Sequence, residues 1–186
     1  MSRPSSKDAI LDAAESVVRE SGAVHMTLDA VAERAGISKG GLLYNFPTKE
    51  SLLEAMIARQ VGKCEAQRAE AALQAGGDAA MKLRSYVDAA FQVEGGMRET
   101  CAPLLAAGAN NPKLLDPVRA HYRRVFKEFQ DSDVDFDDAM MVMMAADGLW
   151  LLEMLQIFPL DDAQRARFHA KLLAMSDQTV QIRFKN

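Results

Sequence analysis

The chain has 186 residues, and 49% of them are hydrophobic whereas only 6% are aromatic. This length suggests one or two folding units, and the abundance of Ala, Leu and Met favours helices. No long alternation of β-branched residues occurs, which argues against a sheet. The formal net charge of −4 does not indicate a nucleic-acid-binding protein, so any DNA-binding surface must gather its cations on one side. We therefore expect an all-α protein.

The N-terminal part of the chain predicts an amphipathic helix over residues 6–21, because its apolar residues recur at helical spacing. The spacing Ser5-x-x-Asp8 resembles a capping box, and Gly22 is expected to end the helix. A loose arm that carries Arg3 is expected before it.

Two short helices joined by a tight turn are predicted next, over residues 28–35 and 39–46. Thr27 and Ser38 are good N-caps for these helices, and Gly36 suits the left-handed position after the first one. Two helices with a glycine at the bend are typical of a helix-turn-helix, whose second helix can enter the major groove of DNA.

The same segment resembles the DNA-binding domain of TetR-family transcriptional regulators. That family typically shows a glycine turn and then a run such as S-K-G-T-L-Y-Y-H-F-P-S-K. Here the run is S-K-G-G-L-L-Y-N-F-P-T-K, from Ser38 to Lys49. The departures are Gly41, Leu43 and Asn45, where threonine, tyrosine and histidine are common. These departures concern the reading of bases rather than the fold.

The resemblance and the helix termini together predict the residues that contact DNA. Donors at helix starts or on the exposed edge are expected to meet phosphates, namely Thr27, Ser38, Tyr44, Asn45 and Lys49. Lys39 is predicted to donate to guanine, and Leu43 to touch a thymine methyl group. The adjacent Gly40 and Gly41 destabilise a helix by roughly 1 kcal/mol each relative to Ala. They would let the helix backbone sit deep in the groove.

The rest of the chain reads as further helices, predicted over residues 49–73, 78–94, 99–107, 117–130, 139–158 and 161–180. Gly76-Gly77 and Gly95-Gly96 interrupt the pattern. Asn111-Pro112 and Asp116-Pro117 each fit an N-cap followed by proline at the first helical position. The acidic residues 131–138 read as a loop.

The segment Ala139–Phe158 is apolar nearly all round and is long enough to suggest a membrane span. Asp147, Glu153 and Gln156 argue against that interpretation. A helix that is apolar on every side must be buried on every side, which requires a second chain. In TetR-like proteins the last two long helices pair with their twins in a dimer. We therefore expect a homodimer formed by surfaces around Leu149, Leu152, Phe168 and Leu172.

A small-molecule effector site is a further expectation, and it depends mostly on the resemblance. Met side chains in the segment 139–158 make adaptable walls for apolar ligands, although core packing explains most of them equally well. The candidate lining residues are Phe91, Met97, Cys101, Leu105, Tyr122, Met144 and Trp150. The alternative is a fully packed core and constitutive DNA binding.

Several patterns that could carry catalysis are better explained otherwise. The residues Gly36 to Gly40 match G-x-S-x-G, but that motif needs a preceding strand, whereas here a helix precedes it. His25, His121 and His169 are dispersed and form no metal-ligand pattern. No phosphate-binding or dinucleotide-binding fingerprint occurs. We therefore expect no enzyme, no metal and no cofactor.

Two other features have one interpretation and one alternative each. Cys64 and Cys101 form no C-x-x-C pair and no secretory signal is evident, so a reduced, cytoplasmic protein is expected, with redox sensing as the alternative. A run of basic residues reads as a solvated helix face, with a second anion site as the alternative; it comprises Arg119, His121, Arg123, Arg124 and Lys127.

Taken together, the sequence predicts a cytoplasmic, homodimeric, TetR-like transcriptional regulator. A helix-turn-helix domain at residues 1–47 would bind double-stranded operator DNA. A helical domain at residues 48–186, joined to it by the helix over residues 48–73, would dimerise and bind the effector. The resemblance implies a repressor that a small, largely apolar effector releases from DNA. The alternatives are an activator, an architectural protein or ligand-independent regulator of the same fold, and a protein-interaction module that uses Leu43 and Tyr44.

Overall fold

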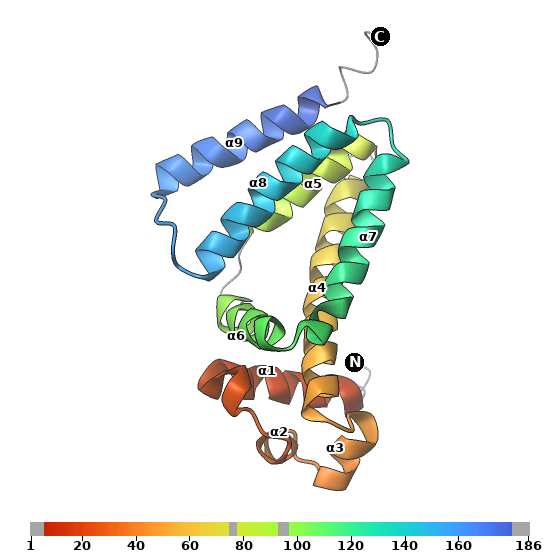
Figure 1. Ribbon diagram of the computed structural model, residues 1–186, viewed down its shortest axis with the longest axis vertical. Helices are drawn as coiled ribbons and strands as arrows, with labels where there is room; N and C mark the ends of the chain where they lie inside the picture. Colours follow the sequence, from red (N-terminus) through yellow and green to blue (C-terminus); the bar gives the residue numbers. More distant parts are fainter. Residues whose placement is uncertain (1–5, 75–77, 93–96, 180–186) are drawn as a thin grey trace. The chain divides into compact units, whose positions relative to one another are not determined.

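The structure is a computed structural model, and it describes residues 6–74, 78–92 and 97–179. These residues form nine α-helices and one 3-10 helix and include no strand, which confirms the expected all-α class (Figure 1). In chain order the elements are α1 Ser6–His25, α2 Leu28–Arg34, α3 Lys39–Asn45, α4 Lys49–Gln74, α5 Ala79–Phe91, α6 Met97–Asn110, η1 Pro112–Leu115, α7 Asp116–Gln130, α8 Phe136–Met154 and α9 Asp162–Gln178.

Some of the sequence predictions lie outside the described residues. They are the arm with Arg3, the cap at Ser5, the interruptions at Gly76-Gly77 and Gly95-Gly96, and the helix end at Val180. Within the described ranges, no helix is both long enough and apolar enough to cross a membrane.

The chain divides into two compact units, one formed by Met1–Val61 with Gly95–Ala120 and the other by Gly62–Glu94 with His121–Asn186. Both α4 and α7 therefore contribute to each unit. The predicted functional domains, residues 1–47 and 48–186, stay a prediction.

The first unit is built around α1, which packs on α2 and on α6. Its core contains the fully buried side chains of Ile10, Val31, Leu42 and Met56. These residues come from α1, α2, α3 and the start of α4, so one apolar side of each helix meets in a common core. Gly22 adopts φ 80, and this breaks the regular helix at the predicted position, although helical turns continue to His25.

The second unit is built around α5, which packs along α8 and α9 (Figure 1). Its core includes the buried side chains of Leu83, Val87, Phe129 and Met143. The apolar helix predicted near the C-terminus is α8, but only part of its circumference is covered in one chain. Met141 is 57% exposed and Met144 is 50% exposed.

The predicted limits of that apolar helix, residues 139 and 158, were wrong at both ends. It begins at Phe136, because the side chain of Asp135 caps it by accepting a hydrogen bond from the backbone N–H of Asp138 at 3.0 Å. Acidic residues predicted as a loop therefore form the first turn. The helix ends at Met154 in a Schellman motif, in which Ile157 N–H donates to the Leu152 carbonyl at 3.1 Å. Gln156, with φ 56, holds the left-handed position.

Three other helix predictions also need correction. The helix predicted over residues 99–107 is longer, Met97–Asn110, and it continues through Pro103, which removes one internal hydrogen bond without ending it. The helix predicted to reach Glu94 ends at Phe91. Asn111-Pro112 opens only a short 3-10 helix, and the Asn111 side chain makes no capping hydrogen bond.

Candidate DNA interface and buried polar site

The turn between α2 and α3 is fixed by contacts within a few residues. Thr27 Oγ1 accepts from Ala30 N–H at 3.2 Å and Ser38 Oγ accepts from Gly41 N–H at 3.1 Å, so each side chain caps the helix that follows it. Gly36 has φ 66, and the backbone N–H of Ile37 donates back to the Ala32 carbonyl at 3.0 Å. This Schellman ending of α2 sets the direction of α3.

The outward side of α3 carries Gly40, Gly41 and Tyr44, of which Tyr44 is 89% exposed. The fold of this chain does not require either glycine. A Cβ at Gly41 would lie 3.4 Å from Ser38 Oγ, an ordinary contact, and a Cβ at Gly40 would lie 4.0 Å from the same atom. Packing within the chain therefore does not explain two glycines in a seven-residue helix, and this favours close approach of another molecule.

The other predicted contact residues of this region are held by hydrogen bonds at its surface. Lys39 Nζ lies 2.9 Å from the Asp29 carboxylate, and both side chains are more than half exposed. Asn45 Nδ2 donates to the Gly41 carbonyl at 3.0 Å. Lys49 Nζ donates to the Val24 carbonyl at 2.7 Å, and thus holds the end of α1 to the start of α4. Leu43 is half-buried.

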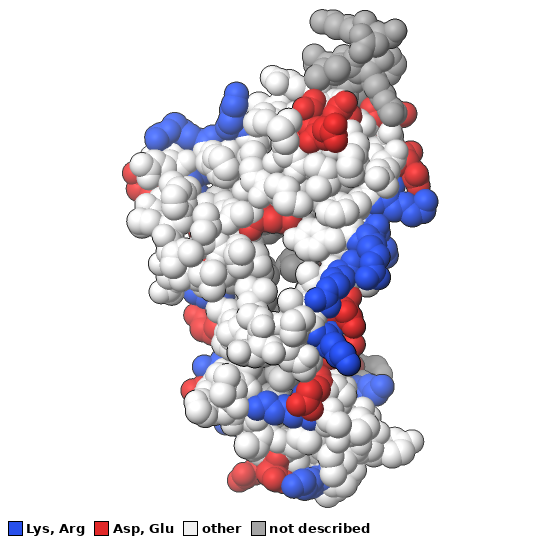
Figure 2. Space-filling view, in the orientation of Figure 1, with Lys and Arg blue, Asp and Glu red and all other residues white. Residues whose placement is uncertain are grey.

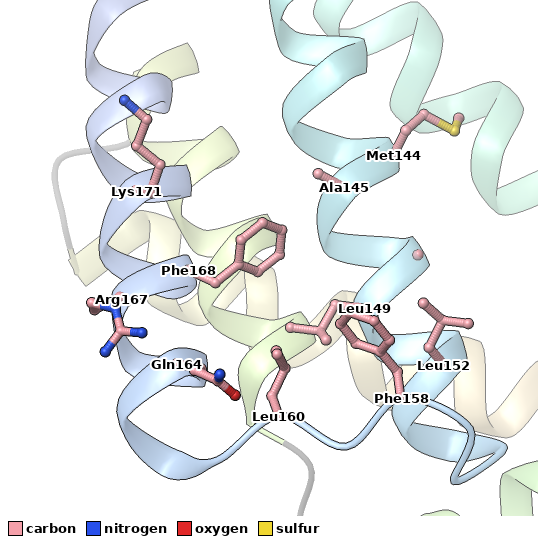
Figure 3. A pocket seen from close by; sticks show the side chains of 11 residues that line it. Met144, Ala145, Leu149, Leu152, Phe158, Leu160, Gln164, Arg167, Phe168 and Lys171 are labelled. Atoms are coloured by element: carbon pink, nitrogen blue, oxygen red, sulfur yellow. The ribbon is translucent and has the colours of Figure 1, made fainter.

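A hollow in the second unit, the α8–α9 groove, has a volume of about 590 Å³. Figure 3 shows Phe168 projecting from α9 toward Ala145 and Leu149 of α8, whereas Met144 projects away from α9. Its lining residues are Met144, Ala145, Gly148, Leu149, Leu152, Phe158, Leu160, Gln164, Arg167, Phe168 and Lys171. A Cβ built at Gly148 would have no atom within 4 Å, so another helix could approach closely there.

The four predicted dimer residues differ in what they offer to a partner. Leu149 and Leu172 are only 5% and 2% exposed, because they belong to the core of their own unit. Leu152 and Phe168 are half-buried and line the groove. Apolar side chains that continue this surface are exposed, namely Met141, Leu151, Leu155, Ile157 and Phe158.

The seven predicted effector residues divide between the two units. Those on α6 belong to the first unit, namely Met97, Cys101 and Leu105, and the others to the second, namely Phe91, Tyr122, Met144 and Trp150. Phe91 is packed against α9, where its ring stacks on His169 with centroids 4.4 Å apart. A single pocket that gathers all seven side chains stays a prediction.

A polar cluster inside the second unit was not foreseen from the sequence. Asp147, near the middle of the apolar helix α8, accepts hydrogen bonds from the Tyr86 hydroxyl at 2.7 Å and the Tyr122 hydroxyl at 2.8 Å. Burial raises the pKa of the Asp147 carboxyl above its ordinary value, and the two hydrogen bonds offset only part of that change. Burial, and then the negative charge of Asp147, raise the pKa of both tyrosine hydroxyls.

Arg68 of α4 extends this cluster, with its guanidinium carbon 4.3 Å from the centroid of the Tyr86 ring. Arg68 Nη1 lies 3.2 Å from His121 Nε2, and His121 Nδ1 lies 2.7 Å from Glu65 Oε1. Because arginine can only donate, Nε2 must accept, which leaves the His121 proton on Nδ1 facing Glu65. Burial alone raises the pKa of Glu65, but hydrogen bonds from His121 and Arg124 outweigh it and hold that pKa below its ordinary value.

The sequence contained one signal for this cluster. A lone carboxylate in the middle of an apolar helix must find hydrogen-bond donors if it is buried. From the sequence, Asp147 serves only as evidence against a membrane span, and His121 reads as a dispersed histidine or as part of a basic run. Their partners lie on α4, α5 and α7, and local spacing does not reveal them.

The basic run along α7 is visible in Figure 2 as a row of Lys and Arg side chains. Three of its four Arg and Lys side chains pair with carboxylates. These pairs are Arg119 with Asp116 at 2.6 Å, Arg124 with Glu65 at 2.5 Å, and Lys127 with Asp131 at 2.8 Å. These pairs favour the interpretation as a solvated helix face.

Two family models match the chain. The family described as bacterial regulatory proteins, tetR family, matches residues 10–56, and the tetracyclin repressor-like C-terminal domain matches residues 81–177. The chain belongs to the TetR family. It is therefore a DNA-binding transcriptional regulator and a member of a non-enzyme family.

Curated relatives of this TetR-family regulator include HTH-type transcriptional regulators named BetI. One from Paraburkholderia xenovorans is 29% identical over 168 residues, which cover 82% of this chain and 83% of the relative. One from Stenotrophomonas maltophilia is 26% identical over 158 residues, with 80% and 81% of the two chains covered.

Solved structures resemble it in fold. A transcriptional regulator from Rhodococcus sp. Rha1 has a TM-score of 0.70 at 20% identity and covers 94% of this chain and 96% of its own. The multidrug binding protein EbrR, solved in complex with imidazole, has a TM-score of 0.70 at 20% identity and covers 93% of this chain and 96% of its own.

Proposed function

We propose that this regulator is a repressor that binds operator DNA as a homodimer and is released by a small, largely apolar effector. The observation that carries the DNA-binding part is the outward side of α3, where two glycines that the fold does not need stand beside a highly exposed tyrosine. Such a surface suits a helix whose backbone approaches base edges in the major groove.

The proposed contacts follow from the positions of the side chains. Thr27 and Ser38 stand at helix N-termini, where backbone N–H groups and hydroxyls can meet phosphates. Tyr44, Asn45 and Lys49 would add further phosphate contacts. Lys39 and Leu43 would read bases, and Lys39 would then exchange its surface pair with Asp29 for a guanine.

The proposed dimer uses the α8–α9 groove. Support comes from the exposed methionines of α8 and the open space at Gly148, which a second copy of the same helices would cover. A two-fold dimer reads a pseudo-palindromic site with half-sites about 34–36 Å apart or a multiple of that distance.

The proposed switch requires an effector with different affinities for two conformations of the protein. The movable element would be α4, because it begins at Lys49 beside the DNA-binding helices and continues into the unit that holds the Asp147 cluster. The structural relative EbrR, in complex with imidazole, supports the idea that this fold can hold a small molecule.

Selection from a random DNA library tests the proposal. The protein should enrich a pseudo-palindromic duplex, and that duplex placed in a promoter should lower reporter transcription. Higher transcription in the presence of the protein would establish the alternative, an activator. Repression that no compound in an apolar library relieves would favour ligand-independent regulation of the same fold.

The dimer is tested by Leu152→Glu, because a charge buried in an apolar interface without a partner costs several kcal/mol. We expect the dimer to dissociate about 100-fold more readily, since about 2.7 kcal/mol corresponds to that factor. Leu73→Glu is the matched control, because Leu73 on α4 is 78% exposed. Sedimentation velocity at micromolar concentration measures the result, and an intact Leu152→Glu dimer would contradict the proposed interface.

A further inference from the structure

A second hollow of the second unit, the α4–α7 groove, has a volume of about 570 Å³. This size is within the range of small-molecule sites. One side is apolar and includes Ala72, Leu73 and Val125. The other side is charged and is formed by Glu65, Arg68, Lys82, His121, Arg124 and Glu128. The groove therefore offers both an apolar wall and a polar wall to a ligand.

The charges of the polar wall do not cancel. Lys82 pairs with Glu128 at 2.8 Å, and Arg124 pairs with Glu65 at 2.5 Å. Arg68 has no carboxylate within ion-pair distance among the described residues. Among the residues that line the groove, three cations and two carboxylates leave one formal positive charge, that of Arg68; the Asp147 carboxylate is not part of this lining.

Arg68 also carries an unsatisfied donor. Its Nη1 group faces His121, and its guanidinium covers the ring of Tyr86. Its Nε atom is buried and has no hydrogen-bond partner. Leaving a buried N–H of a charged group unpaired is unfavourable, and such groups are rare in folded proteins. Arg68 also lines the groove, so an anion bound there would pair with an arginine that has no carboxylate partner within ion-pair distance.

We propose that the α4–α7 groove binds a small organic anion, a carboxylate with a short hydrocarbon body. The carboxylate pairs with Arg68, which lines the groove, and the hydrocarbon part covers Ala72, Leu73 and Val125. The neighbouring Lys82 and Arg124 keep their own glutamates, so the site selects a single negative charge rather than a polyanion. Naming this anion as the effector rests on the proposed function, whereas its binding does not.

Asp147 is not among the residues that line the groove, so it does not offer a carboxylate to a cationic ligand there. A cationic ligand would have to share the cluster with Arg68, which already lies over Tyr86. Asp147 accepts hydrogen bonds from the Tyr86 and Tyr122 hydroxyls, which hold its carboxylate inside the cluster. Within the lining of the groove, an anion balances the charge of Arg68, whereas a cation adds a second positive charge beside it.

Calorimetry on the wild-type protein with three probes of equal length tests the assignment without any variant. We expect sodium octanoate to bind at least tenfold more tightly than 1-octanol, and octylammonium to bind more weakly than either. Equal binding of octanoate and octanol would overturn the assignment of a charged head. Preferential binding of octylammonium would overturn the choice of an anion. Absence of octanoate binding at millimolar concentration would overturn the proposal.

The variant Arg68→Met identifies the residue, because methionine keeps the apolar stem over Tyr86 and removes the charge. Loss of a charge-assisted hydrogen bond should weaken octanoate binding about 10- to 100-fold. Arg123→Met, an exposed cation on α7, should bind octanoate as the wild type does. Equal affinity of the Arg68→Met variant would remove Arg68 from the site.

The role as effector is measured separately by titration of octanoate into the complex with selected DNA. Linkage requires that DNA weaken octanoate binding by the same factor by which octanoate weakens DNA binding. Octanoate binding that leaves DNA affinity unchanged would contradict the effector role and leave the anion site standing. Relief of repression by another compound, with no octanoate binding, would contradict the anion site and leave the repressor standing.

Discussion

The helix-turn-helix of the first unit and the Asp147 cluster of the second unit satisfy their polar groups in opposite ways. In the helix-turn-helix the caps are local: Thr27 and Ser38 each accept from a residue three positions ahead. In the Asp147 cluster the partners are distant in sequence, with 61 positions between Tyr86 and Asp147 and 53 between Arg68 and His121. Local contacts leave a surface free for another molecule, whereas distant contacts join four helices around a buried charge.

Local and distant contacts suit two different functions, DNA recognition and sensitivity to a change in helix packing. A surface that recognises DNA needs rigid helix ends and exposed groups, and local capping provides both. A buried charged cluster is sensitive to any change in the helices that supply its members, because an unpaired charge in a low dielectric is unfavourable. We therefore expect substitutions in the first region to change DNA affinity with little effect on folding. Substitutions in the second should change stability and the response to pH or ligand.

The largest expected effect is that of Gly41→Leu on DNA binding. A leucine side chain on the outward side of α3 would hold the helix away from the groove and weaken specific binding at least 100-fold, which corresponds to about 2.7 kcal/mol. The domain should still fold, because a Cβ at this position meets only Ser38 Oγ at 3.4 Å. Gly62→Leu, at an open position of α4, is the control that should leave binding unchanged. A Gly41→Leu protein that selects the same site with the same affinity would show that α3 lies elsewhere.

A smaller effect is expected for Lys49→Ala, and it tests whether the local contacts and the DNA contacts are separate. Loss of a phosphate contact should weaken binding roughly tenfold at all sequences alike and flatten the salt dependence by about one unit of slope. Lys49 also donates to the Val24 carbonyl, so the thermal midpoint should fall slightly. Lys113→Ala, on η1, is the control for charge alone. A lower midpoint with an unchanged salt slope would restrict Lys49 to a structural role.

Features that depend on local contacts could be predicted from the sequence, whereas features that depend on distant contacts could not. Thr27, Ser38 and Gly36 were identified because each acts on backbone groups a few residues away. The end of α8 uses the same Schellman motif as the end of α2, but Gln156 stands where glycine is usual, and the sequence therefore gave no signal. The hydrogen bonds between Asp147 and its tyrosines could not be predicted, because they depend on which helices pack together.

For Cys64, the sequence leaves two interpretations, a reduced thiol and a redox sensor, and the surroundings of the thiol distinguish between them. Burial raises the pKa of the Cys64 thiol, and the nearby positive charge of Arg68 offsets only part of that change. A thiol with a raised pKa holds less thiolate and reacts slowly with oxidants. The alternative of a redox sensor at Cys64 is therefore disfavoured by its surroundings.

The smallest expected effect is a change in how stability depends on pH, and it tests the buried region alone. Because burial raises the pKa of Asp147 in the folded protein, the folded state holds more protons than the unfolded state between about pH 4, the ordinary pKa, and the raised value. In that window the free energy of unfolding falls as pH rises. The asparagine of the Asp147→Asn variant cannot ionise, so this part of the decline in the free energy of unfolding should disappear. The variant should therefore gain stability relative to the wild type from acid to neutral pH.

The control is Asp137→Asn, the same change at an exposed position of α8, for which the free energy of unfolding should depend on pH as in the wild type. Urea unfolding at a series of pH values gives both curves. Parallel curves for Asp147→Asn and the wild type would mean that the carboxylate titrates as if it were exposed, and the contrast between the two regions would fail at its central residue.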